Sequence, residues 1–206
     1  MGLLDFFRRP PPIRDVAALA EFIDSNAAFL VQKGIYEYAR ARAGHYSKVL
    51  FAEEGFVEAV EQARWQAYPL GLAMVAEMVE GILRPLAGDD RRTIVDALAG
   101  VVLDVFDRYP TPAVPGGRSG WHDARLELAH RLNLIGVHAV KPVKDIPEPY
   151  AQAYFDLMPI YEQLRKPDFH AIRNYLRVSL INIHDRLCER IDAHAVVAEL
   201  RAPPPR

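Results

Sequence analysis

The segment YPLGLAMVAEMVEGILRPL, residues 68–86, decides how this chain must fold. Its apolar side chains point in all directions around a helix, and a helix that is apolar all round is normally buried. Pro69 and Pro85 bound the segment, and two acids, Glu77 and Glu80, lie in its middle. A buried carboxylate needs a charged partner, hydrogen bonds or a shifted pKa. The segment therefore predicts a buried helix that places two acidic groups in or beside the core.

The rest of the chain also predicts helices, because alternation with period two never persists and apolar residues recur at helical spacing. Asp15 is expected to cap a helix, and Asp24 and Ser25 to cap a second one that ends near Gly44. Another helix is expected to stop before Pro69. Beside the buried segment, later helices are expected over about residues 89–109, 121–140, 150–164 and 168–200.

The expected fold is all-α, a single-domain orthogonal or irregular helical bundle of about seven to nine helices. A helical domain over residues 13–200 would consist of two halves, 13–109 and 120–200. A loop rich in proline and glycine, 110–120, joins these halves. An apolar and basic N-terminal arm (1–12) and a loose tail (201–206) flank the domain.

Composition limits the class of protein. Of the 206 residues, 50% are apolar and 25% are charged, which favours a substantial core over disorder. The net charge of -2 argues against nucleic acid as the main partner. A single cysteine, Cys188, excludes an internal disulfide framework and fits a reducing compartment. With no apolar region suited to a secretory signal and two acids in the middle of segment 68–86, we expect a cytoplasmic protein without a transmembrane helix.

The two acids have both a functional and a structural interpretation. Glu77 and Glu80 lie three residues apart on one helix face. Paired carboxylates can bind a metal or divide the roles of acid and base. Arg84, four residues after Glu80, offers instead a helical ion pair.

Glu127 and His130 form a Glu-x-x-His motif, which occurs twice in di-iron helical bundles. Here it occurs once, so the pair is only a weak candidate for a mononuclear metal site, and no metal is predicted. An ion pair between Glu127 and Arg131 accounts for the same residues. The sequence identifies no cofactor.

Basic and hydroxyl side chains gather near the predicted helix end at Gly44. Guanidinium groups and hydroxyls there could receive a carboxylate or phosphate, although basic residues also favour the end of a helix through its dipole. Together with the aromatic side chain of Trp65 and the two acids of segment 68–86, these side chains form the predicted ligand-binding set. Its members are Arg40, Arg42, His45, Tyr46, Trp65, Glu77 and Glu80.

The N-terminal arm has no evident role in the core. It carries four apolar residues and then two arginines, an arrangement suited to a partner's groove or to a bilayer surface. The predicted contact residues are Leu3, Leu4, Phe6, Phe7, Arg8 and Arg9.

No recognisable catalytic motif is present, so the favoured hypothesis is a non-catalytic helical adaptor or accessory subunit that docks a larger protein assembly. A protein partner is expected, a homo-oligomer stays open, and membrane contact would be peripheral at most, through the arm. The alternative is a small-molecule binding protein or an enzyme, hydrolytic or metal-dependent, with an interhelical pocket.

Overall fold

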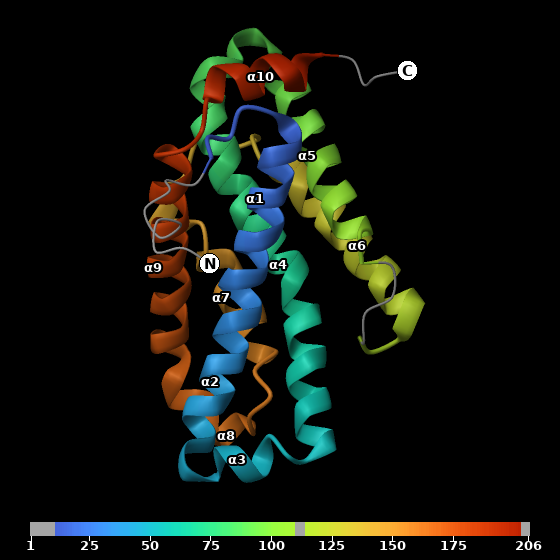
Figure 1. Ribbon diagram of the computed structural model, residues 1–206, viewed down its shortest axis with the longest axis vertical. Helices are drawn as coiled ribbons and strands as arrows, with labels where there is room; N and C mark the ends of the chain where they lie inside the picture. The colour runs from blue at the N-terminus through green and yellow to red at the C-terminus, as the bar shows by residue number, and fades with distance from the viewer. Residues whose placement is uncertain (1–10, 110–113, 203–206) are drawn as a thin grey trace, which may run out of the picture.

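The computed structural model describes residues 11–109 and 114–202, and within these ranges the chain is all-helical (Figure 1). The all-α class is confirmed. The expected number of helices, seven to nine, is slightly too high when only helices of at least ten residues are counted, since six of the helices below reach that length. The helices are α1 Val16–Ala28, α2 Gly34–Ala43, α3 Ser47–Leu50, α4 Glu54–Ala87, α5 Arg91–Asp107, α6 Gly117–Leu134, α7 Glu148–Asp156, α8 Glu162–Arg165, α9 Phe169–Cys188 and α10 Ala193–Arg201.

The 34-residue helix α4 forms the centre of the molecule, and residues 71–80 within it are all buried, as predicted for segment 68–86. The predicted stop before Pro69 is wrong, because the helix continues through this proline. Proline removes one backbone hydrogen bond, but packing of a buried helix can outweigh that loss. Gly71 allows a close helix crossing, since a Cβ atom there would lie 2.8 Å from the carbonyl oxygen of Ala27 in α1.

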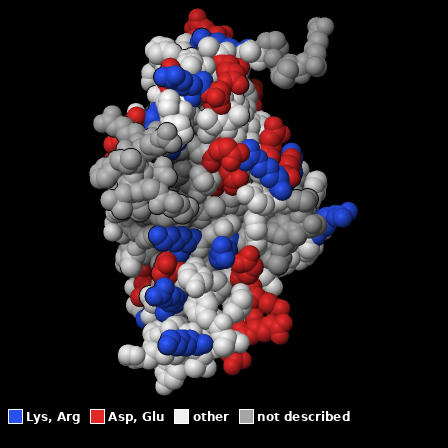
Figure 2. All heavy atoms as spheres, viewed as in Figure 1, with Lys and Arg blue, Asp and Glu red and all other residues white. Residues whose placement is uncertain are grey.

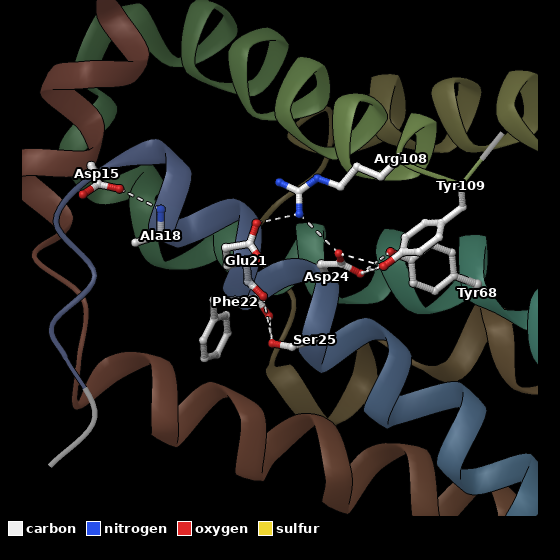
Figure 3. Close-up of polar contacts among 9 residues, drawn as sticks. All are labelled: Asp15, Ala18, Glu21, Phe22, Asp24, Ser25, Tyr68, Arg108 and Tyr109. Atoms are coloured by element: carbon white, nitrogen blue, oxygen red, sulfur yellow. Dashed lines mark hydrogen bonds and ion pairs between the residues drawn. The ribbon is translucent and has the colours of Figure 1, made fainter. Parts of the chain in front are cut away.

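Asp24 and Ser25 lie inside α1 and cap no helix, so the predicted boundary there is wrong. Asp24 instead accepts hydrogen bonds from the hydroxyls of Tyr68, at 2.6 Å, and Tyr109, at 3.1 Å (Figure 3). Arg108 adds an ion pair at 3.3 Å. Burial and the neighbouring Asp24 carboxylate raise the pKa of Tyr68, which keeps its hydroxyl a donor. These contacts hold α1 against α4 and against the end of α5.

The chain turns between α9 and α10, so the predicted single helix over 168–200 is wrong. Asp192 caps α10 by accepting a hydrogen bond from the backbone N–H of Ala195. Beside this turn Ile13 forms an isolated parallel bridge with Ile191. The predicted cap at Asp15 is confirmed, with 2.7 Å between its carboxylate and the N–H of Ala18.

Residues from both halves of the sequence share one hydrophobic core. Buried side chains of α1, α4 and α5 lie in it together with those of α6, α7, α9 and α10. Among residues 11–109 and 114–202, no helix is long and apolar enough to cross a membrane.

Candidate functional site

A groove of about 560 Å³ lies between α9 and the continuous helix formed by α1 and α2. In Figure 1 these helices run side by side. We call this feature the α2–α9 groove. It is lined by Phe29, Lys33, Gly34, Glu37, Tyr38, Ala171, Ile172, Tyr175, Ser179, Asn182 and Arg186.

One wall of the groove is a π-helical turn, Phe29–Lys33, where α1 passes into α2. A π-turn widens the helix and disturbs the regular pattern of backbone hydrogen bonds. Two tyrosines satisfy backbone carbonyls of this turn: the hydroxyl of Tyr175 donates to Leu30 O at 3.1 Å, and that of Tyr154 donates to Val31 O at 2.9 Å. The wall is therefore held in place by α7 and α9.

Gly34 follows the π-turn and allows these tyrosines to approach. A Cβ atom at this position would lie 2.5 Å from the Tyr154 hydroxyl and 2.5 Å from Cε1 of Tyr175. Any larger residue would therefore push aside the groups that satisfy the turn.

Hydrogen bonds join the two sides of the groove at both ends. At one end Arg186 donates to the Asn26 side chain, and at the other the Tyr38 hydroxyl donates to Asp168, each at 2.8 Å. Burial, the hydrogen bond and the charge of Asp168 raise the pKa of Tyr38 to about 12, so this hydroxyl stays protonated at neutral pH. These two hydrogen bonds therefore mark the two ends of the groove along the helix axes.

The rim of the groove carries an exposed aromatic ring between two cations. Phe29 is 41% exposed, with Lys33 Nζ 4.7 Å and the Arg186 guanidinium 5.7 Å from its ring centroid. Glu37 lies one turn further along α2, toward the other end. Basic and acidic side chains are interspersed over the face that Figure 2 shows. The arrangement suits an apolar ligand surface with negative charge at the Phe29 end.

The predicted ligand-binding residues do not form a single pocket. Arg40, His45 and Tyr46 are exposed around the end of α2, and Arg42 pairs with Asp168 at 2.8 Å. The chain passes from there through α3 into the start of α4, and Glu77 lies 23 residues beyond that start. At 1.5 Å per residue, this places Glu77 about 35 Å along the helix. Ligand binding at the end of α2 stays a prediction.

Trp65 belongs to an aromatic cluster between α4, α5 and α6. Its ring lies 5.2 Å from that of Tyr109 and 6.1 Å from that of Trp121, and its indole N–H donates to Glu61 at 2.9 Å. Trp121 stacks on Phe106 at 4.1 Å. These contacts give Trp65 a packing role.

Glu80 forms the ion pair with Arg84 that the sequence predicted as the structural alternative. The guanidinium donates to both carboxylate oxygens, at 2.7 and 2.6 Å, and the Glu80 side chain is 3% exposed. Arg84 also donates to the backbone carbonyl of His138 at 2.8 Å. Glu80 thus acts through Arg84 to fix the segment after α6.

Glu77 has different partners. It is 6% exposed, and Lys141 Nζ lies 2.7 Å from its Oε1 atom, with His138 Nε2 at 3.7 Å. These residues come from the segment that Glu80 and Arg84 hold. The two acids therefore have separate roles, one fixing a backbone segment and the other facing the side chains of that segment.

The weak metal candidates receive no support from the described residues. Glu127 pairs with Arg131 at 2.9 Å, as the structural alternative predicted, and His130 is exposed. Within residues 11–109 and 114–202, no group of three or more His, Cys, Asp or Glu side chains could hold a metal ion.

The predicted contact residues of the N-terminal arm, Leu3 to Arg9, lie outside the described residues. Their contact with a partner or a membrane stays a prediction.

No protein-family model, curated protein or solved structure matches this chain. Its function must therefore be inferred from its own geometry. The α2–α9 groove could not be predicted from the sequence, because no local pattern in residues 29–33 indicates a π-turn and the two supporting tyrosines lie more than 120 residues away in the chain.

Proposed function

We propose that this protein is a non-catalytic docking protein that holds a helical segment of a protein partner in the α2–α9 groove. The observation that carries the proposal is the exposed Phe29 ring, flanked by Lys33 and Arg186, at the edge of the groove. Exposed aromatic and arginine side chains beside a concavity are typical of the residues that dominate binding energy at protein interfaces.

The length of the groove fits a helix that lays one face of side chains into it. Its lining on α9 extends from Ala171 to Arg186, which corresponds to about 22 Å at 1.5 Å per residue. This length matches about four turns of an amphipathic helix, the form in which many partners bind apolar grooves.

The charges of the rim define the partner's chemistry. Lys33 and Arg186 lie beside Phe29 and favour carboxylates, whereas Glu37 lies toward the other end. We therefore expect a partner helix with apolar residues at intervals of three and four, and with aspartate or glutamate at the end that meets Phe29.

Replacing Phe29 by alanine is expected to weaken partner binding about thirtyfold or more, since truncation of a dominant interface residue costs at least about 2 kcal/mol. The fold should be retained, because the ring is 41% exposed. The measurement is the amount of partner that co-purifies with the full-length chain, followed by the dissociation constant of the isolated complex.

Leu126→Ala provides the matched control, because Leu126 is also a large apolar residue, 54% exposed, but lies on α6 outside the groove lining. Binding should be unchanged in this variant. Equal binding by Phe29→Ala and the wild type would refute the proposed role of the groove.

A further inference from the structure

A second pocket, of about 270 Å³, lies where α4, α6 and α7 meet the segment after α6. It shares no lining residue with the α2–α9 groove. Its walls are Glu77, Arg131, Leu134, Ile135, Val137, His138, Lys141, Pro149 and Tyr150. Partner docking in the α2–α9 groove therefore assigns no role to this pocket.

Two of its polar atoms are buried without a hydrogen bond. Four such side-chain atoms occur among the described residues, and two of them, Oε1 of Glu77 and Nε of Arg131, belong to residues of this pocket. Lys141 Nζ lies 2.7 Å from the Glu77 atom, and Glu127 Oε1 lies 2.9 Å from the Arg131 atom. These contacts are ion pairs that lack hydrogen-bond geometry. Buried polar atoms normally find a partner, so Glu77 and Arg131 retain hydrogen-bonding capacity beside the pocket.

The pocket presents charges of both signs. Arg131 and Lys141 contribute positive charges and Glu77 a negative charge, while Glu127, outside the lining, pairs with Arg131 at 2.9 Å, so the two cations and the two carboxylates balance. The cation of Arg131 also lies 5.4 Å from the ring centroid of Tyr150. Burial and the Glu77 charge raise the pKa of Tyr150 to about 12, so its hydroxyl is a hydrogen-bond donor at neutral pH.

Two features position the segment that lines the pocket after α6. Gly136 has a φ of 87°, a conformation that favours glycine, and Arg84 binds the carbonyl of His138. His138 and Lys141 are thereby presented to Glu77, and the aliphatic part of the wall consists of Leu134, Ile135, Val137 and Pro149.

We propose that this pocket binds a small 2-hydroxy or 2-amino carboxylate. The ligand's carboxylate would contact Arg131 and Lys141, its hydroxyl or ammonium group would donate to Glu77, and its short aliphatic chain would contact Leu134 and Val137. At about 30 Å³ per water molecule, the pocket has the volume of roughly nine waters, which is enough space for a small carboxylate of this kind.

Two matched sets of acids test this proposal by isothermal titration calorimetry with the full-length protein. The three-carbon set is propionate, L-lactate and L-alanine, and the branched five-carbon set is isovalerate, L-2-hydroxyisovalerate and L-valine. At least one hydroxy or amino acid should bind with a dissociation constant below 1 mM and at least tenfold more tightly than the parent acid of its set. Absence of binding by all six at 10 mM, or equal binding within each set, would overturn the proposal.

Variants locate the site. Glu77→Gln and Lys141→Met are each expected to weaken binding at least tenfold, with Lys144→Met as the control, since Lys144 is exposed and outside the lining. Thermal unfolding of each variant checks that it is folded. If Glu77→Gln unfolds the protein, the comparison of Lys141→Met with Lys144→Met still tests the location of the site. Equal ligand affinity of these two variants would refute the proposed site.

Discussion

Replacing Glu80 by alanine is expected to lower the free energy of unfolding by about 3–5 kcal/mol, the typical cost of removing one partner of a buried ion pair. The substitution leaves the Arg84 guanidinium, whose side chain is 13% exposed, without either carboxylate oxygen. For a chain of this length the thermal midpoint should fall by roughly 6–20 °C. Circular dichroism during thermal and urea unfolding measures both quantities.

Asp96→Ala is the matched control. It removes the same type of pair at the same helical spacing, Arg92 with Asp96, but these side chains are 60% and 53% exposed. Exposed pairs contribute about 0–1 kcal/mol. If Glu80→Ala costs no more than Asp96→Ala, the role assigned to Glu80 is wrong.

The same substitution should loosen the segment after α6. Glu80 accepts two hydrogen bonds from the Arg84 guanidinium, and the same guanidinium donates to His138 O. Backbone hydrogen exchange in residues 135–141 should therefore accelerate in Glu80→Ala more than in Asp96→Ala. Faster exchange confined to this segment would show that the Glu80–Arg84 pair holds it locally, whereas faster exchange throughout the chain would show a general loss of stability.

Replacing Gly34 by alanine is expected to cost about 2–4 kcal/mol, although alanine is normally the better helix former. The added Cβ atom would lie 2.5 Å from both the Tyr154 hydroxyl and Cε1 of Tyr175. Moving these rings breaks the hydrogen bonds to the carbonyls of the π-turn. Urea unfolding gives the free energy.

Gly100→Ala is the appropriate control, because Gly100 lies within α5 and a Cβ atom there would meet nothing within 4 Å. This variant should gain up to about 1 kcal/mol from helix propensity. A similar gain in Gly34→Ala would show that the two tyrosines do not hold the π-turn as described.

Local pattern predicted the parts of this fold that depend on nearby residues. The buried segment 68–86, the cap at Asp15 and the Glu80–Arg84 pair all follow from spacing within one or two helical turns. The partner of Glu77 does not, because Lys141 lies 64 residues away in the sequence and approaches only once α6 has packed on α4.

Two of the wrong helix boundaries have a common cause. Pro69 and the pair Asp24–Ser25 favour helix ends locally, yet the helices continue through both. At Asp24, hydrogen bonds to Tyr68 and Tyr109 replace the capping role. Tertiary contacts thus outweighed local preference at both positions.

The most direct test of the docking proposal is site-specific photo-crosslinking in cells of origin, with a benzophenone amino acid at Asn182 or Asn174. Both residues are exposed on α9, but only Asn182 lines the groove. We predict that position 182, but not 174, crosslinks to a partner segment with apolar residues spaced as in an amphipathic helix and acidic residues at one end. No capture at either position, equal capture at both, or a captured segment without that pattern would contradict the account.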